Sequence, residues 1–164
     1  MRKLFVFGLT FLLLFSCGNK QRTEQIIETV ELEFDVQKLP KKSILNSGAK
    51  AILETWAEFN DLDSAFDGLY TVENYEELIL LIDEFIEKQN ALAASTYPET
   101  FDKPQVKSRQ KVFKTYILKV KATLEYRKNP LEPTIEMVNA FNDLRNQFNV
   151  MVNYNFDTKM ILDE

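Results

Sequence analysis

The side chains that most often carry out catalysis or bind metals are scarce in this sequence. The 164 residues include no histidine and a single cysteine, Cys17. Without histidine the chain lacks the commonest general base, the Glu-x-x-His ligands of di-iron bundles and the usual protein ligand of haem. One thiol cannot form a disulfide within the chain. The composition therefore argues against an enzyme, and we expect no cofactor.

Carboxylates are abundant, and residues 61–68 have the composition of a calcium loop. An EF-hand loop needs oxygen ligands at positions 1, 3 and 5 and glycine at position 6. Counted from Asp61, the last two of these positions hold Ala65 and Phe66. No P-loop, G-x-G-x-x-G or G-x-S-x-G motif occurs either. We interpret these acids as solvated side chains at a helix end and predict neither a metal site nor catalytic residues.

The amino terminus has the layout of a secretory signal that ends at the lone cysteine. Arg2 and Lys3 supply a positive charge at the start, residues 4–15 are mostly apolar, and Ser16 and Cys17 follow. A membrane-spanning helix needs roughly 20 apolar residues, and this run is shorter. Residues 14–17 resemble the lipobox of bacterial lipoproteins. The alternative is an ordinary cleaved signal whose cysteine is incidental.

The lipobox resemblance implies that residues 1–16 are removed and that Cys17 carries a diacylglyceryl group, usually with amino-terminal acylation. Such a thiol is not available for nucleophilic chemistry or zinc. Each buried methylene contributes about 0.8 kcal/mol, so two or more chains hold a protein firmly on its membrane. Gly18 stands where an enterobacterial inner-membrane retention signal would place Asp. We therefore expect lipid anchoring in the cell envelope, in the outer membrane and facing the periplasm.

Composition limits the fold and the partners of the remaining chain. The formal charge is -5, and loss of Arg2 and Lys3 with the signal would make it -7. A nucleic-acid binder would be basic, so nucleic acid is not an expected partner. Only 4 Gly but 13 Phe and 6 Tyr are present. Few turn residues and long periodic stretches favour an all-α fold with an aromatic core.

Residues 17–42 are predicted to form the lipidated cysteine and a tether. A flexible coil of this length would span about 25 to 30 Å. Within it Val30, Leu32, Phe34 and Val36 alternate with acids, which is a strand-like period. Such an arm could lie along a groove of its own domain or pair with another protein. Whether residues 26–36 are strand, helix or disordered stays open.

Residues 43–164 are predicted to form four amphipathic helices. The first is expected to span residues 43–68 and to end at Gly68, since glycine takes positive φ without steric cost. Asn74, with Glu77, is the expected cap of the second, and Thr71 is the alternative. The apolar stripes are Ile52, Trp56, Phe59, Leu62, Phe66 and Leu69; Tyr75, Leu78, Ile79, Ile82, Phe85, Ile86 and Leu92; Val106, Phe113, Ile117, Val120 and Leu124; Val138, Phe141, Leu144, Phe148, Met151 and Val152.

The remaining two helices are expected to begin at caps formed by Asp102 and Thr134. Short connections between four helices favour an up-and-down antiparallel four-helix bundle. An even number of helices brings both ends of residues 43–164 to one pole, which we expect to lie nearest the lipid.

Three surface features could carry function. On a helical wheel Leu80 points away from the core, so it must be covered by the arm, covered by a partner, or left exposed. Lys107, Lys111, Lys114 and Lys121 share the outer face of the third helix. They could meet anionic lipid headgroups, or form a solvated face that complements the acidic first and second helices.

The third feature is a ladder on the fourth helix, spaced three, four, three, four, of Asn139, Asn142, Asn146, Asn149 and Asn153. Asparagine is a mediocre helix former. The ladder is either a polar groove that hydrogen-bonds a glycan or peptide, or a solvated face.

These observations lead to two hypotheses of function. The first is a lipid-anchored bundle that acts by contact with an envelope protein, as an accessory or scaffolding lipoprotein. The alternative is a periplasmic ligand-binding or sensing module with a small ligand between the helices, lined by Trp56 and the aromatic first helix.

Overall fold

A computed structural model describes residues 34–162 of the chain, with the side chains of residues 34–153. The signal, the lipidated Cys17 and most of the tether, which we predict for residues 1–33, lie outside the described residues. The described residues belong to one unit, Glu31–Glu164. None of their helices is both long enough and apolar enough to cross a membrane.

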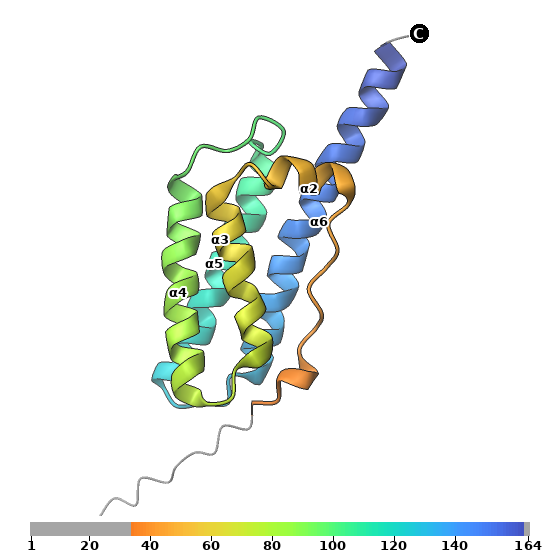
Figure 1. Cartoon of the computed structure of the whole chain (residues 1–164). Helices are drawn as coiled ribbons and strands as arrows, with labels where there is room; N and C mark the ends of the chain where they lie inside the picture. Colours follow the sequence, from red (N-terminus) through yellow and green to blue (C-terminus); the bar gives the residue numbers. More distant parts are fainter. Residues whose placement is uncertain (1–33, 163–164) are drawn as a thin grey trace, which may run out of the picture. The chain divides into compact units, whose positions relative to one another are not determined.

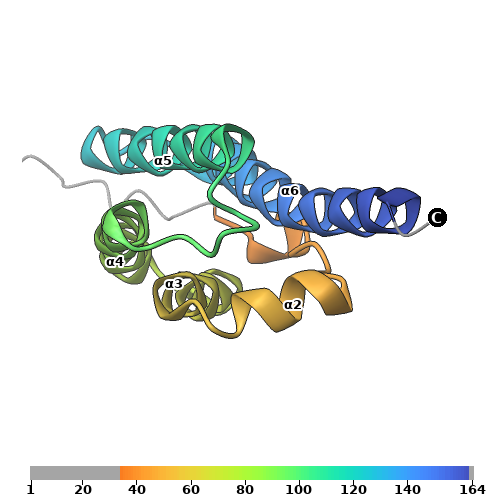
Figure 2. The same cartoon turned by 90° about the horizontal axis from the view of Figure 1, so that it is seen from above.

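Four helices form the bundle: α3 (Ala57–Asp67), α4 (Tyr75–Ala94), α5 (Pro104–Glu125) and α6 (Leu131–Leu162). Helix α3 packs against α4, α4 against α5, and α5 against α6, in an up-and-down arrangement (Figure 1). Figure 2 shows the four helices from one end. Between residues 34 and 162 the structure contains helices and 3-10 turns but no β-strand. The predicted all-α four-helix bundle is confirmed.

Aromatic side chains fill the interior of the bundle. Phe59, Phe66 and Phe141 are at most 1% exposed. The Phe66 ring centroid lies 4.1 Å from that of Phe141 and 5.3 Å from that of Phe85, and both pairs are stacked. Most residues of the four predicted stripes are buried. Ile79, which we assigned to the second stripe, lies at its edge and is 36% exposed.

The first predicted helix is wrong as a single element. It is divided into α2 (Ser47–Leu53) and α3, separated by a turn. At the start of α3, Trp56 has extended backbone angles, φ -107 and ψ 90. Its side chain is 3% exposed and donates a hydrogen bond to Ser95 Oγ at 2.8 Å. The helix thus breaks at a buried indole, and the apolar period continues across the break because both segments contribute buried residues to the same core.

Gly68 ends α3 as predicted, but not by the predicted conformation. Its φ is -58 and its ψ is -25, so the chain continues into a 3-10 turn, η3 (Gly68–Thr71). A Cβ at this position would lie 3.5 Å from Leu81 Cδ1, an ordinary contact. Positive φ is therefore not the reason for glycine here.

Helix caps could be predicted only in part. Asn74 caps α4, since its side chain accepts the Glu77 N–H at 2.9 Å. The predicted cap Asp102 is wrong: α5 begins with Pro104 after Lys103, without a side-chain cap, and Asp102 pairs instead with Lys107 at 2.5 Å.

Thr134 is also wrong as the cap of α6. The helix begins at Leu131, whose N–H is accepted by Asn129 Oδ1 at 2.9 Å. Thr134 is buried in the first turns and donates to the carbonyl of Pro130 at 2.8 Å. The hydroxyl is therefore satisfied inside the helix, and the side chain of Asn129 caps the amino terminus.

The end of the predicted tether lies against the bundle. Phe34 and Val36 pack on the core and Leu39 is buried. Val36 lies in a 3-10 turn, η2 (Val36–Lys38), so the strand-like alternation does not describe this part of the arm. Residues 39–46, which we call the strap, then run beside α6 to α2 (Figure 1). Helix α2 and the end of α6 lie toward one pole of the bundle, and residues 34–38 lie at the other pole (Figure 1). Which pole lies nearest the lipid stays a prediction.

Candidate functional site

The strap is held on α6 by asparagine side chains that bind its main chain. Asn142 Oδ1 accepts the N–H of Ser43 at 2.7 Å, and Asn142 Nδ2 donates to the carbonyl of Lys41 at 2.9 Å. Asn149 repeats the arrangement: its Oδ1 accepts the N–H of Asn46 at 2.8 Å and its Nδ2 donates to the carbonyl of Ile44 at 2.9 Å. Each amide thus binds the carbonyl of one residue and the N–H of the residue two positions later.

The spacing of the two asparagines matches the repeat of an extended chain. Asn142 and Asn149 are seven residues apart, which is about 10.5 Å along an α-helix. The strap groups that they bind recur every three residues. Three residues make one turn of polyproline II, with a rise of about 9 Å, whereas a β-strand would repeat every two. The distance between the two asparagines along α6 is therefore close to the length of three extended residues of the strap.

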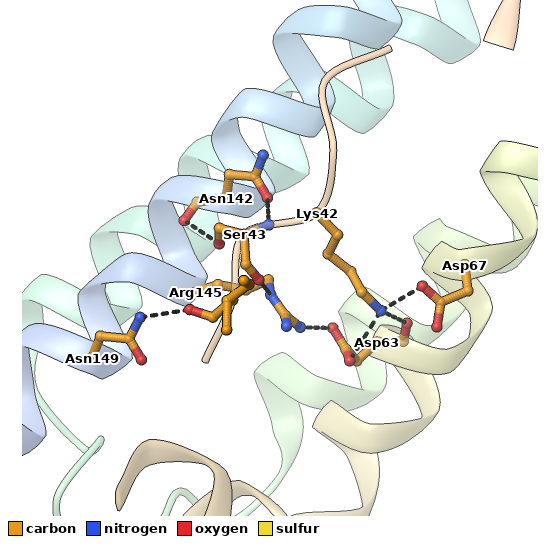
Figure 3. Close-up of polar contacts among 8 residues, drawn as sticks. Lys42, Ser43, Asp63, Asp67, Asn142, Arg145 and Asn149 are labelled. Atoms are coloured by element: carbon orange, nitrogen blue, oxygen red, sulfur yellow. Dashed lines mark hydrogen bonds and ion pairs between the residues drawn. The ribbon is translucent and has the colours of Figure 1, made fainter. Parts of the chain in front are cut away.

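A buried arginine adds charge to this site. Arg145 is 6% exposed, its Nε donates to the carbonyl of Ser43 at 2.9 Å, and its guanidinium pairs with Asp63 of α3. Lys42 lies on the other side of Asp63, at 3.3 Å from its Oδ2 and 2.5 Å from Asp67 Oδ1. Figure 3 shows the two cations from α6 and the strap converging on the acids of α3. The ion pairs thus tie three segments together.

A phenol secures the strap near its start. Tyr70 in η3 donates to the carbonyl of Pro40 at 2.8 Å. Burial raises the pKa of Tyr70, and the Asp67 carboxylate raises it further, against an opposing effect of Arg145. The phenol therefore stays protonated at neutral pH and remains a donor to the strap.

The site on α6 binds the backbone of the strap more than its side chains. Ile44, in the middle of the strap, is 87% exposed. Lys42 is the exception, because its ammonium is bound by Asp63 and Asp67. Chemically, this arrangement recognises an extended peptide and selects for a cation at one position.

The structure divides the predicted asparagine ladder. Asn142 and Asn149 bind the strap, and Asn153 Oδ1 accepts from Asn46 Nδ2 at 3.3 Å. Asn139 and Asn146 are exposed. Part of the ladder therefore binds a segment of the same chain, and binding of a separate glycan or peptide stays a prediction.

Sequence reasoning missed Arg145, Lys42 and Asp63. One signal could have identified Arg145: it lies within the apolar stripe of α6, four residues after Phe141 and three before Phe148, and a charge inside such a stripe is rarely buried without a partner. No comparable signal marks Lys42 or Asp63.

The lysine face of α5 is largely engaged with its surroundings. Lys121 pairs with Asp83 of α4 at 2.7 Å, and this hydrogen bond raises the pKa of Lys121. Lys114 donates to Asn90 of α4 at 2.7 Å, and Lys107 pairs with Asp102. Lys111 is exposed, with no ion pair within the part of the chain that the structure describes. These contacts favour the interpretation of the four lysines as a solvated face that complements α4, over contact with lipid headgroups.

Leu80 lies on the outer surface of α4 and is 70% exposed. It borders an open hollow of about 280 Å³ lined by Gly68, Thr71, Val72, Glu77, Leu80, Leu81 and Glu84. The described part of the arm, from Phe34 onward, does not cover it. Residues 30–33, the rest of the alternating segment, lie outside the described residues.

Trp56, the residue that we expected to line a ligand site, is packed instead. Its ring lies 4.8 Å from that of Tyr97 and 6.3 Å from that of Phe148, centroid to centroid. The cleft nearest the strap lies at the surface. It has a volume of about 430 Å³, and the charged residues lining it are Lys42, Lys50, Glu54, Asp63 and Arg145.

Replacement of Asn142 or Asn149 should release only the part of the strap that the replaced side chain binds. Asn142→Ala should speed hydrogen exchange of the Ser43 amide, and Asn149→Ala that of the Asn46 amide. Each variant loses two hydrogen bonds worth about 0.5–1.5 kcal/mol apiece, so we expect the free energy of unfolding to fall by about 1–3 kcal/mol. Asn139→Ala is the control and should change neither amide. Equal acceleration of both amides in all three variants would contradict this assignment.

Among residues 34–153 no group of three or more acidic or cysteine side chains is arranged to hold a metal ion. The described surface offers three features: the asparagines of α6 that bind the strap, the apolar hollow beside Leu80 and the polar cleft near the strap. The chain matches no protein-family model, no curated protein and no solved structure.

Proposed function

We propose that this protein is a lipid-anchored component of the cell envelope that acts by contact with another protein, as an accessory or scaffolding lipoprotein. The observation that carries the contact function is the exposure of Leu80, 70%, beside the hollow on α4. The anchor is supported by the sequence of residues 1–17 alone.

The surroundings of Leu80 define the chemistry that a partner would need. The residues that line the hollow include the apolar Val72 and Leu81 and the acidic Glu77 and Glu84. Glu76 is a further exposed acid on the same helix. Exposed apolar area with a polar rim is typical of protein interfaces. The best-fitting partner surface presents an apolar side chain flanked by basic residues.

A charge placed in the hollow should abolish the contact without unfolding the bundle. Leu80→Asp should remove the protein neighbour that crosslinking captures in intact cells, because a carboxylate in the hollow loses the apolar contact and must be desolvated against the partner's apolar side chain. The free energy of unfolding should change by no more than about 0.5 kcal/mol, since the side chain is exposed. Crosslinking followed by identification of the captured protein measures the first effect, and thermal unfolding the second.

Two further variants complete this experiment. Leu118→Asp introduces the same change on α5, where Leu118 is 46% exposed, and should leave the neighbour in place. Cys17→Ser should release the protein from the membrane fraction. Capture of no neighbour above background by the unaltered protein would remove the contact function.

The surface cleft favours a second candidate, a binding module for a small ligand. Lys42, Lys50 and Arg145 line it together with Glu54 and Asp63, in a volume of about 430 Å³, which suits a ligand that carries both charges. Phe59 lines the cleft, and its ring centroid is 6.1 Å from that of Trp56. A change in tryptophan fluorescence with a zwitterionic amino acid as probe, lost in Lys50→Ala, would favour this candidate.

A further inference from the structure

The asparagines of α6 form two columns with the same spacing. The first column, Asn142 and Asn149, holds the strap. The second column consists of Asn139, Asn146 and Asn153, again seven residues apart. Seven residues fall only about 20° short of two helical turns, so the members of each column lie nearly above one another. The geometry that lets the first column follow a peptide is therefore present twice.

The second column lies beside the strap, on the side of the solvent. At 100° per residue, Asn146 is about 40° around the helix from Asn142 and about 60° from Asn149. Asn139 and Asn146 are exposed, and within the described residues their side chains make no hydrogen bond. Asn153, at the end of the column, accepts the side-chain N–H of Asn46 at 3.3 Å. The column therefore reaches the edge of the strap and presents two amides that have no hydrogen-bond partner among the described residues.

Two exposed apolar side chains belong to the strap and to α6. Ile44 is 87% exposed, and its carbonyl is bound by Asn149. Val150 is 56% exposed and lies one turn after Asn146 on α6. Ile44, in the neighbouring strap, and Val150 are two of the large apolar side chains that are exposed in the described chain. This apolar exposure is independent of the asparagine spacing and also indicates a contact surface.

The described fold accounts for Asn153, which contacts Asn46, but not for Asn139 and Asn146. Asparagine is a mediocre helix former, and the side chains of Asn139 and Asn146 contribute no hydrogen bond to the described fold. Straight-chain polar residues would solvate the surface equally well and favour the helix more. The first column, by contrast, satisfies backbone groups of the strap that need partners where the strap lies against α6.

We propose that Asn139, Asn146 and Asn153 bind an extended peptide segment of a second protein, laid along α6 next to the strap. Each amide accepts the N–H of one peptide residue and donates to the carbonyl two positions earlier, as Asn142 and Asn149 do in the strap. Successive asparagines engage groups three residues apart. Residues whose N–H is engaged cannot be proline, and apolar side chains of the peptide contact Ile44 and Val150. This site is separate from Leu80 and extends the proposed contact function to a second surface.

The test uses the full-length lipidated protein in detergent micelles and a peptide of known sequence. The probe is a capped nonapeptide with the sequence of residues 39–47, because its backbone is already bound in this manner. We expect saturable shifts of the side-chain amide resonances of Asn139 and Asn146, with those of Asn142 and Asn149 unchanged. Asn146→Ala should weaken binding about tenfold, which corresponds to the loss of two hydrogen bonds.

Three controls test whether the second column binds the backbone of the peptide. Nonaproline has the polyproline II conformation but no N–H and should cause no shift. Asn90→Ala on α4 should leave the affinity unchanged, and so should Leu80→Asp, whatever becomes of the contact at the hollow. Shifts confined to Asn142 and Asn149, equal shifts with nonaproline, or no shifts would each overturn the proposal.

Discussion

Replacement of Arg145 with methionine should lower the free energy of unfolding by about 3 kcal/mol. Removal of one partner from a buried ion pair typically costs about 3–5 kcal/mol, because the other charge is left without compensation. The lower end applies because Asp63 keeps Lys42 and is 23% exposed in its side chain. The carbonyl of Ser43 also loses its donor. Equilibrium denaturation of the full-length protein measures this change.

Arg109 provides a matched control for Arg145 on the same bundle. It pairs with Asp143 at 3.3 Å, but the two side chains are 49% and 57% exposed. Exposed pairs contribute about 0–1 kcal/mol, so Arg109→Met should have a small effect. If the two methionine variants lost equal stability, the guanidinium of Arg145 could not be the link between strap and bundle. Hydrogen exchange at Ser43 should rise in the Arg145 variant alone.

The second large effect is expected at Phe66, in the middle of the aromatic core. Phe66→Ala should cost about 3–5 kcal/mol, since it removes a fully buried ring and leaves a cavity that the neighbouring rings cannot fill. Phe66 is 0% exposed and contacts rings from the three other helices of the bundle, those of Phe85, Phe113 and Phe141. Thermal and chemical unfolding both report the change. Domains are stable by only about 5–15 kcal/mol, so the variant should unfold well below the unaltered protein.

Two substitutions show whether the loss at Phe66 comes from packing. Phe66→Leu retains most of the volume and should cost less than Phe66→Ala. Tyr126→Ala removes an aromatic side chain that is 76% exposed and should change stability by no more than about 0.5 kcal/mol. Similar losses in Phe66→Ala and Tyr126→Ala would mean that the stacked rings do not hold the bundle together.

Helical periodicity predicts this fold well because it is a local property. The position of a side chain on a helical wheel depends only on its distance along the chain, so the apolar stripes and the outward direction of Leu80 follow without knowledge of the neighbours. The cap at Asn74 is local for the same reason, as its partner Glu77 is three residues away. Asp102 failed as a cap because α5 begins one residue later than predicted, so that Lys103 occupies the cap position.

The candidate site could be predicted only in outline. The asparagine ladder is visible in the sequence, and its amides can both donate and accept, but water satisfies an exposed amide as well as a peptide does. The partner of Asn142 is Ser43, 99 residues earlier, and that of Asn149 is Asn46, 103 residues earlier. No local pattern indicates that the end of a predicted tether returns to lie on the last helix.

By itself the sequence determined the helical class, the four apolar stripes, the absence of histidine chemistry and the lipobox resemblance at Cys17. Only the tertiary structure decided that α2 separates from α3 at Trp56, that Arg145 is buried, and that part of the ladder is filled by the strap. The physical reason is the range of the interactions involved. Stripes and wheel positions arise within one helix, whereas the indole, the guanidinium and the amides take their partners from whichever distant surface packing brings to them.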